Sequence, residues 1–255
     1  MNELCALLFD VDGTLADTER DGHRVTFNMA FEKAGLDWHW SEALYGELLA
    51  ITGGKERMKH YLKTHRPDFH YDGDLNALVA GLHETKTAFY TELLSKGGVP
   101  LRPGVERLLR EARESGLKLA IATTTTFANV EALLKYSVGP QAMDWFGVIA
   151  AGDVVPAKKP APDIYDYVLD CMQLKPGECM AFEDSENGLI SASAAKLRTI
   201  ITINGYTRSH RFDGATIVLD QMGEDNAPFT VLSKTPVNGA RYLSLDLVRR
   251  LHERP

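Results

Sequence analysis

Residues 4–14 read Leu-Cys-Ala-Leu-Leu-Phe-Asp-Val-Asp-Gly-Thr, and this stretch decides the fold class. Its first six residues are apolar without interruption, which is typical of a strand buried on both faces of a parallel sheet. Two carboxylates, Asp10 and Asp12, follow at once. In an open α/β sheet, ligands bind beyond the carboxyl ends of the strands. The stretch therefore predicts a buried strand that leads directly into a polar site.

Further apolar stretches alternate with helical patterns along the rest of the chain. The predicted strands cover residues 4–9, 117–122, 147–151, 179–182, 199–203 and 216–219. The helices predicted between and after them cover residues 105–115, 129–136, 162–172, 185–195 and 243–252. Strands that alternate with helices are typical of βαβ units. We therefore predict an α/β fold, with a Rossmann-like parallel sheet flanked by helices.

The interval between the first two predicted strands breaks this rhythm. It contains no strong strand pattern, and helical patterns fill it at residues 19–34, 41–50, 55–63 and 75–96. We therefore expect an inserted, all-helical cap domain at residues 16–100. The catalytic core is then made of residues 1–15 and 101–255.

Charge and apolar patterning exclude several classes of protein. The 255 residues include 28 Lys and Arg against 35 Asp and Glu, a formal net charge of −7. Nucleic-acid binding needs a basic face, so we expect no nucleic-acid partner. The apolar run at 4–9 is too short for a membrane span or a signal peptide, so we expect no membrane association and a cytoplasmic location. The three cysteines match no zinc pattern and no disulfide framework.

Two acidic pairs each follow a predicted strand. Asp10 and Asp12 come after the first strand, and Glu183 and Asp184 come after the strand at 179–182. Carboxylates crowded at strand ends repel one another and need a cation, and Mg²⁺ prefers carboxylate, water and phosphate oxygens. Taken alone, the first pair could be a solvated turn and the second a helix N-cap. Together, they predict one shared magnesium site.

Two further polar segments could bind a phosphate. Lys159 lies before a proline and just upstream of a predicted helix, where it could neutralise a carboxylate and a phosphate oxygen together. Lys158 is not excluded, but Lys159 directly precedes the proline. The threonine run at 123–126 follows the second strand, where hydroxyl and backbone N–H groups could hold a phosphate. Taken alone, these segments would be a solvated loop and a strand cap.

The order Asp-x-Asp, Thr, Lys and Glu-Asp resembles that of the haloacid dehalogenase superfamily of aspartate-dependent phosphatases, whose helical cap the predicted insertion also resembles. The resemblance implies that Asp10 is the nucleophile that forms an aspartyl-phosphate. Asp12 would protonate the leaving oxygen and then activate water, and Thr123 and Lys159 would hold the phosphoryl group. The implied magnesium ligands are Asp10, Asp12 through its carbonyl, Asp184, and Glu183 as a ligand or as a partner of the ligands.

The predicted cap carries more specific motifs. Residues 17–24 and 53–58 are similar to segments of the CbbY-type sugar phosphatases, which are associated with the Calvin cycle and remove a phosphate from xylulose 1,5-bisphosphate. A glycine pair that opens a helix beside two cations also forms an anion site. The expected substrate-binding residues are Glu19, His23, Gly53, Gly54, Lys55, Arg57, Lys86 and Thr124. Taken alone, His23 would be a surface or helix-start residue and Lys86 a solvated helix lysine.

The sequence thus predicts a monomeric, magnesium-dependent phosphatase whose partner is a small phosphosugar, with xylulose 1,5-bisphosphate as the expected substrate. A phosphomutase of the β-phosphoglucomutase type would use the same Asp10 and Asp12 but return the phosphoryl group to the sugar. A broader sugar-phosphate phosphatase is a second alternative. A sugar-phosphate-binding or regulatory protein is disfavoured, because every predicted catalytic position is intact.

Overall fold

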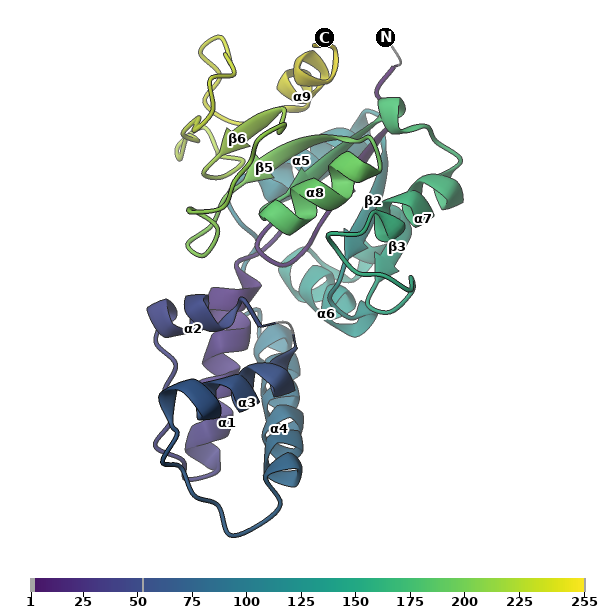
Figure 1. Ribbon diagram of the computed structural model, residues 1–255. Helices are drawn as coiled ribbons and strands as arrows, with labels where there is room; N and C mark the ends of the chain where they lie inside the picture. The colour runs from purple at the N-terminus through teal and green to yellow at the C-terminus, as the bar shows by residue number, and fades with distance from the viewer. Residues whose placement is uncertain (1–2, 52, 255) are drawn as a thin grey trace. The chain divides into compact units, whose positions relative to one another are not determined.

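The computed structural model describes residues 3–51 and 53–254 (Figure 1). The chain folds into two compact units. The core unit comprises Met1–Asp17 and Pro100–Pro255, and the helical unit comprises Thr18–Val99. No helix in the described ranges is both long and apolar enough to cross a membrane.

The core unit is built on a six-stranded parallel sheet, which confirms the predicted Rossmann-like α/β fold. The strands are β1 (Ala6–Phe9), β2 (Lys118–Thr123), β3 (Phe146–Ala151), β4 (Cys179–Glu183), β5 (Arg198–Thr202) and β6 (Ile217–Leu219). Their order is β3-β2-β1-β4-β5-β6, so β1 lies between β2 and β4. Every side chain of β1 is buried, which explains its uninterrupted apolar sequence.

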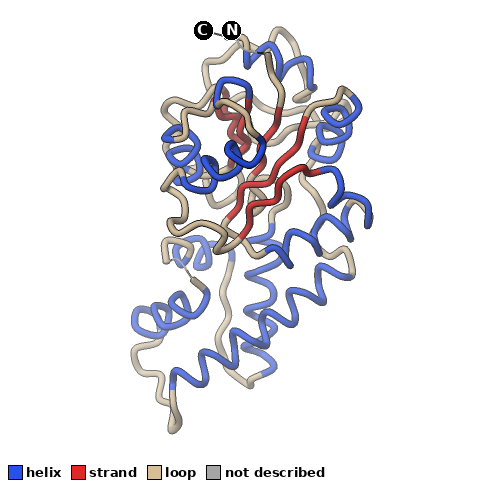
Figure 2. Tube along the Cα trace, turned by 90° about the vertical axis from the view of Figure 1, so that its right-hand side faces the viewer, coloured by secondary structure: helices blue, strands red, loops and turns tan. Residues whose placement is uncertain are grey.

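Helices pack against the sheet, as Figures 1 and 2 show. The helices of the core unit are α5 (Val105–Glu114), α6 (Phe127–Ser137), α7 (Asp163–Met172), α8 (Glu186–Ala194) and α9 (Leu245–His252), with short 3₁₀ turns η2 (Pro140–Trp145) and η3 (Pro176–Glu178). Tyr165 and Val168 of α7 pack with Ala120 of β2 and Ala181 of β4 in one hydrophobic cluster. Because all strands are parallel, their carboxyl ends meet at one edge, where the loops after them converge.

The described elements of the helical unit are all helices. They are the π-helix η1 (Thr18–His23), α1 (Arg24–Lys33), α2 (Glu42–Leu48), α3 (Gly54–His65) and α4 (Leu75–Ser95). The helix predicted at 19–34 therefore begins with a π-helical turn before it becomes an α-helix. Aromatic rings form the centre of this unit: the Trp40 ring lies 4.8 Å from Phe27 and 4.9 Å from Phe31 between centroids.

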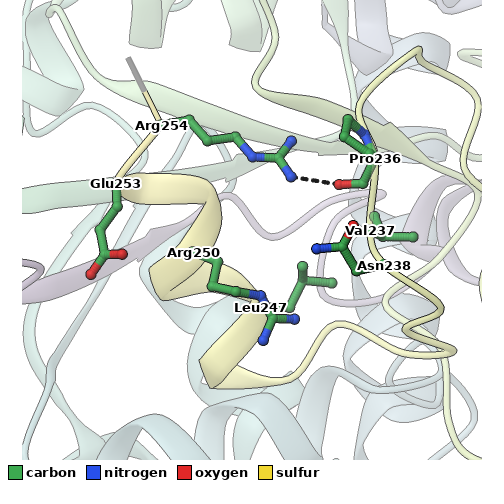
Figure 3. Close-up of a pocket in the computed structure, with 7 residues that line it drawn as sticks. All are labelled: Pro236, Val237, Asn238, Leu247, Arg250, Glu253 and Arg254. Atoms are coloured by element: carbon green, nitrogen blue, oxygen red, sulfur yellow. Dashed lines mark hydrogen bonds between the residues drawn. The ribbon is translucent and has the colours of Figure 1, made fainter.

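A pocket of about 360 Å³ lies in the core unit between α9 and residues 236–238 (Figure 3). The guanidinium of Arg254 donates a hydrogen bond of 2.5 Å to the carbonyl of Pro236 at this pocket. Its lining contains none of the predicted site residues. This pocket is therefore separate from the residues that the sequence predicts to form the site.

Candidate active site

Asp10 follows β1 directly and is buried at the carboxyl-end edge. Lys159, in the loop between β3 and α7, donates hydrogen bonds to Oδ1 of Asp10 at 2.8 Å and to Oε1 of Glu183 at 2.5 Å. The Thr14 hydroxyl donates to Oδ2 of Asp10 at 3.3 Å. The structure thus brings Asp10, Lys159 and Glu183 together. Lys158 instead forms an exposed ion pair with Asp153.

The ammonium group of Lys159 is buried, with 7% of its side chain exposed. Burial alone would lower the pKa of Lys159, but the carboxylates of Asp10 and Glu183 outweigh it and raise the pKa above its ordinary value. The ammonium also donates to the carbonyl of Ala122 at the end of β2, at 2.8 Å. These contacts fix a permanent positive charge beside Asp10.

Glu183 ends β4 and is fully buried. Its Oε1 accepts a second hydrogen bond from the Tyr165 hydroxyl at 2.6 Å, whereas its buried Oε2 has no hydrogen-bond partner within the described structure. Gly188 of α8 packs directly on this carboxylate, since a Cβ there would collide with both oxygens. Burial raises the pKa of Glu183 to about 7; Lys159 opposes this shift and Asp10 adds to it.

The third carboxylate, Asp184, is also buried and accepts a hydrogen bond of 2.6 Å from the side-chain amide of Asn204. Burial raises the pKa of Asp184 well above its ordinary value, and the charges of Asp10 and Glu183 add to this shift. One oxygen from each of the three carboxylates lies within 4.8 Å of the others. Crowded anionic oxygens and the unpartnered Oε2 of Glu183 fit a small, hard divalent cation such as Mg²⁺.

The remaining predicted core residues lie on loops at the same edge. Asp12 is partly exposed two residues beyond Asp10. Thr123 ends β2 and is buried, and its hydroxyl accepts a hydrogen bond of 3.3 Å from the backbone N–H of Thr125. Thr124 is exposed. The edge therefore offers hydroxyl and carboxylate groups next to the buried carboxylates.

In the helical unit, the buried Lys86 pairs with the half-buried His23. Nζ of Lys86 lies 2.7 Å from Nδ1 of His23, and the ammonium lies 4.8 Å from the centroid of the Tyr90 ring. Lys86 is 7% exposed, so the interpretation of a solvated helix lysine is wrong. Burial lowers the pKa of His23 well below its ordinary value, and the charges of Lys86 and Arg57 lower it further. A neutral His23 can accept a hydrogen bond from Lys86.

A second polar chain in this unit links Arg57 to Glu19. Arg57 is buried and donates a hydrogen bond of 2.9 Å to the Tyr45 hydroxyl, which donates to Oε2 of Glu19 at 2.5 Å. Arg57 also donates to the carbonyl of Leu48 at 3.2 Å. Lys55, by contrast, is exposed on the first turn of α3.

The glycine pair opens α3 as the sequence predicts. Gly53 has a φ of +93°, which favours glycine, and precedes the first helical residue, Gly54. A Cβ on Gly54 would come within 2.8 Å of the His83 ring and 3.0 Å of the Phe27 ring. Both glycines are therefore required by local geometry.

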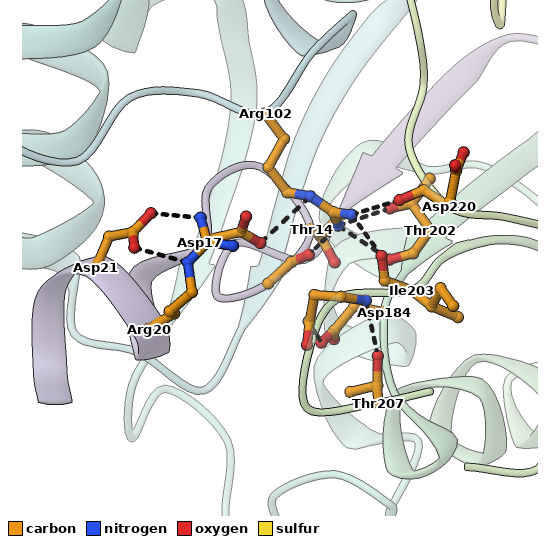
Figure 4. A network of polar contacts seen from close by, with 12 residues as sticks. Thr14, Asp17, Arg20, Asp21, Arg102, Asp184, Thr202, Ile203, Thr207 and Asp220 are labelled. Atoms are coloured by element: carbon orange, nitrogen blue, oxygen red, sulfur yellow. Dashed lines mark hydrogen bonds and ion pairs between the residues drawn. The ribbon is translucent and has the colours of Figure 1, made fainter. Parts of the chain in front are cut away.

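Sequence reasoning missed three residues of the candidate site. Asn204 lies just beyond β5, and a polar residue after an apolar strand is the signal that identified the acidic pairs. Tyr165 lies inside α7 and Arg102 precedes α5, so neither follows a strand. Arg102 forms a network of polar contacts at the same edge of the sheet (Figure 4).

Comparisons with known proteins identify the family of this chain. The sequence model of the haloacid dehalogenase-like hydrolases matches residues 6–196. The protein CbbY encoded on a plasmid of Cupriavidus necator is 43% identical over 247 residues, which are 97% of this chain and 96% of the relative.

Two crystal structures of CbbY from Rhodobacter sphaeroides have similar folds. One holds phosphate and matches with a TM-score of 0.74 and 46% identity. The other is a mutant in complex with xylulose-(1,5)bisphosphate and matches with a TM-score of 0.73 and 45% identity. Each match covers 86% of this chain and 94% of the other.

Proposed function

We propose that this chain, which belongs to the haloacid dehalogenase-like hydrolase family and is a phosphatase of that family, hydrolyses a sugar bisphosphate with magnesium as its cofactor. The observation that carries the proposal is the contact of one ammonium, that of Lys159, with both Asp10 and Glu183 beside Asp184. A nucleophile, a fixed cation and a set of oxygen ligands within one buried site are what phosphoryl transfer to a carboxylate needs.

In this mechanism, Asp10 attacks the phosphorus atom and forms an aspartyl-phosphate, while Lys159 offsets the negative charge of the reacting oxygens. Asp12, two residues further along the loop, gives a proton to the leaving sugar oxygen and later takes one from the attacking water. The Thr123 hydroxyl helps to hold the phosphoryl group. Asp10, Glu183, Asp184 and the carbonyl of Asp12 would hold Mg²⁺. When bound, this ion supplies positive charge that stabilises the phosphoryl oxygens.

We further propose that the helical unit is a cap that binds the second phosphate of the substrate. The charges of Lys86, Arg57 and His83 all act on His23, so basic side chains gather in one part of this unit. Lys55 is exposed beside the Gly53 and Gly54 backbone, where an anion could reach it.

Other polar groups would then meet the sugar. In this proposal Glu19, His23 and Thr124 contact sugar hydroxyls, while Arg57 and Lys86 supply charge from buried positions. Xylulose 1,5-bisphosphate is the proposed substrate, because a related CbbY binds it. We also propose that the enzyme acts as a cytoplasmic monomer.

The test is inorganic phosphate release from a panel of substrates in the presence of Mg²⁺. The panel contains xylulose 1,5-bisphosphate, fructose 1,6-bisphosphate, β-glucose 1-phosphate and p-nitrophenyl phosphate. We expect the highest kcat/KM with xylulose 1,5-bisphosphate and one phosphate released per sugar. Conversion of β-glucose 1-phosphate to glucose 6-phosphate without phosphate release would instead identify a mutase. Similar kcat/KM values for all sugar phosphates would identify a broader phosphatase.

A further inference from the structure

Arg102 is an almost fully buried arginine, 8% exposed, that joins three segments of the core unit (Figure 4). Its guanidinium donates a hydrogen bond to the carbonyl of Gly13 in the loop after β1. It also donates to the carbonyls of Thr202 at 2.9 Å and Ile203 at 2.5 Å, where β5 ends. A further bond of 2.8 Å reaches the carbonyl of Asp220 after β6. A single side chain therefore connects the loops that follow β1, β5 and β6.

Two of these segments lie directly against Asp184. Gly13 has a φ of +86°, and a Cβ there would collide with the carboxylate of Asp184 and the side-chain amide of Asn204. Asn204 follows Ile203 in sequence and donates its hydrogen bond to Asp184. The Asp184 carboxylate is thus enclosed by Gly13 and Asn204, and Arg102 bonds the carbonyls of Gly13 and Ile203.

The same region orients the carbonyl of Asp12. The N–H of Gly13, which belongs to the same planar peptide unit as that carbonyl, donates to the carbonyl of Ala16 at 2.8 Å. The backbone N–H of Arg102 donates to the carbonyl of Leu15 at 2.8 Å. These backbone bonds fix the ends of the segment that follows Asp12, and the Arg102 side chain adds its own bond at the carbonyl of Gly13.

We propose that Arg102 is a positioning residue for magnesium, which holds the Asp12 carbonyl and the Asp184 carboxylate in their binding positions. The inference rests on the proposed function, because that function supplies the metal. In this proposal Arg102 acts through Gly13, whose carbonyl it bonds, and through Asn204, which follows the bonded Ile203. A guanidinium suits this role because its planar set of five donors reaches several carbonyls at once, which the ammonium of lysine does not.

The experiment is isothermal titration of Mg²⁺ into the metal-free full chain, for the wild type, Arg102→Lys and Arg102→Gln. Loss of a group that orients metal ligands typically weakens metal binding about 10- to 100-fold. We expect the Kd for Mg²⁺ to rise about 10-fold in Arg102→Lys and further in Arg102→Gln. Arg102→Lys keeps the positive charge and most of the side-chain volume, so it gives a folded variant if Arg102→Gln does not fold.

Arg107→Lys is the matched control. Arg107 also donates to backbone carbonyls, those of Gly223 at 2.9 Å and Leu243 at 3.3 Å, but it contacts none of the segments around Asp184. We expect its Kd for Mg²⁺ to equal that of the wild type at a temperature where all variants are folded by circular dichroism. An equal rise in Kd for Arg107→Lys would reduce the Arg102 effect to general destabilisation and overturn the inference.

A double variant separates positioning from other roles. Asn204→Ala should weaken Mg²⁺ binding by the same route. The double variant Arg102→Lys/Asn204→Ala should therefore lose less Mg²⁺-binding free energy than the sum of the losses in the two single variants. Additive losses of Mg²⁺ affinity in the double variant would overturn this inference and leave the proposed metal site intact. An unchanged Kd in the Arg102 variants, while the wild type binds Mg²⁺, would do the same. A wild type that binds no Mg²⁺ would overturn the proposed metal site itself.

Discussion

Asp10, Glu183 and Asp184 each place one carboxylate oxygen within 4.8 Å of the others in a buried site, and Lys159 contacts two of these residues, Asp10 and Glu183. The raised pKa values of Glu183 and Asp184 have burial as their largest cause, with mutual repulsion added to it. In the metal-free protein, this repulsion is relieved by holding protons. A bound cation relieves it without protons, which is the physical reason to assign the site to a metal.

Asp10 and Asp12 should fail differently when their carboxylates are replaced. In the proposed mechanism Asp10→Asn removes the nucleophile, so we expect no turnover and no covalent phosphoenzyme. Asp12→Asn keeps the nucleophile but cannot transfer a proton, and we expect kcat to fall by about 10²–10⁴-fold. Rates with a sugar phosphate and trapping of the phosphoenzyme measure both effects. Near-normal turnover of Asp12→Asn on a sugar phosphate would contradict its proposed role.

At the scale of elements, the sequence predicts those parts of the fold that depend on local apolar patterns, above all the strands. The apolar runs indicate the strands, because strands buried on both faces are mainly apolar: β1 is entirely so, and β4 is apolar up to its last residue, Glu183. The first prediction, 4–9, is longer than β1, which spans Ala6–Phe9. Residues that end strands were also accessible to prediction, because parallel strands place their carboxyl ends at one edge.

The part of the site that the sequence does not predict depends on packing between segments that are distant in sequence. Tyr165 reaches Glu183 from inside α7, and no periodicity distinguishes it from other core residues of that helix. Arg102 bonds carbonyls of residues about a hundred positions away in sequence, at Thr202 and Asp220. The burial of Lys86 against His23 likewise depends on the contact between α4 and η1. Contacts between residues so far apart in sequence cannot be predicted from local patterns.

Helix α3 carries a direct test of substrate recognition. Lys55 is exposed beside the glycine pair, and in our proposal it binds the second phosphate of a bisphosphate. Hydrogen bonds to charged groups contribute roughly 1.5–3 kcal/mol, so Lys55→Ala should lower kcat/KM for xylulose 1,5-bisphosphate by about 10-fold or more. Turnover of p-nitrophenyl phosphate, which has no second phosphate, should change little.

Lys59→Ala is the matched control, because Lys59 is an exposed lysine one turn further along the same helix. We expect Lys59→Ala to leave kcat/KM unchanged for both substrates. Equal losses on both substrates in Lys55→Ala would indicate damaged folding or a role at the reacting phosphate. Unchanged kcat/KM for both substrates in Lys55→Ala would mean that the segment at 53–57 is only the start of a helix.

At the scale of the whole molecule, the chain divides into two compact units with different sets of polar groups. The core unit contains the carboxylates and Lys159, and the helical unit contains the pair of Lys86 and His23. The chain enters the helical unit after Asp17 and leaves it before Pro100. A metal bound by the carboxylates of Asp10, Glu183 and Asp184 should stabilise the folded core unit, because a ligand that binds only the folded state favours it.

The stabilisation by Mg²⁺ should increase with pH. Glu183 has a pKa of about 7 in the folded, metal-free protein against an ordinary value of 4.5. Between these values the folded state holds a proton that the unfolded chain has lost, so this carboxyl contributes less stability as pH rises. The pKa of Asp184 shifts in the same direction. Mg²⁺ binds the ionised carboxylates, so its binding competes with these protons and strengthens as pH rises.

Thermal unfolding in chelator and in saturating Mg²⁺ measures this effect as the difference in Tm. We expect the difference to grow from about pH 5 to about pH 7.5, because a ligand that binds the folded state raises Tm more as its affinity increases. Groups that titrate without contact to the metal shift Tm equally in both conditions, so their effect cancels in the difference. In Glu183→Gln, residue 183 has no carboxyl group to titrate, so the Tm difference should increase less with pH. A Tm difference that stays constant or falls as pH rises would contradict a site made of these carboxylates.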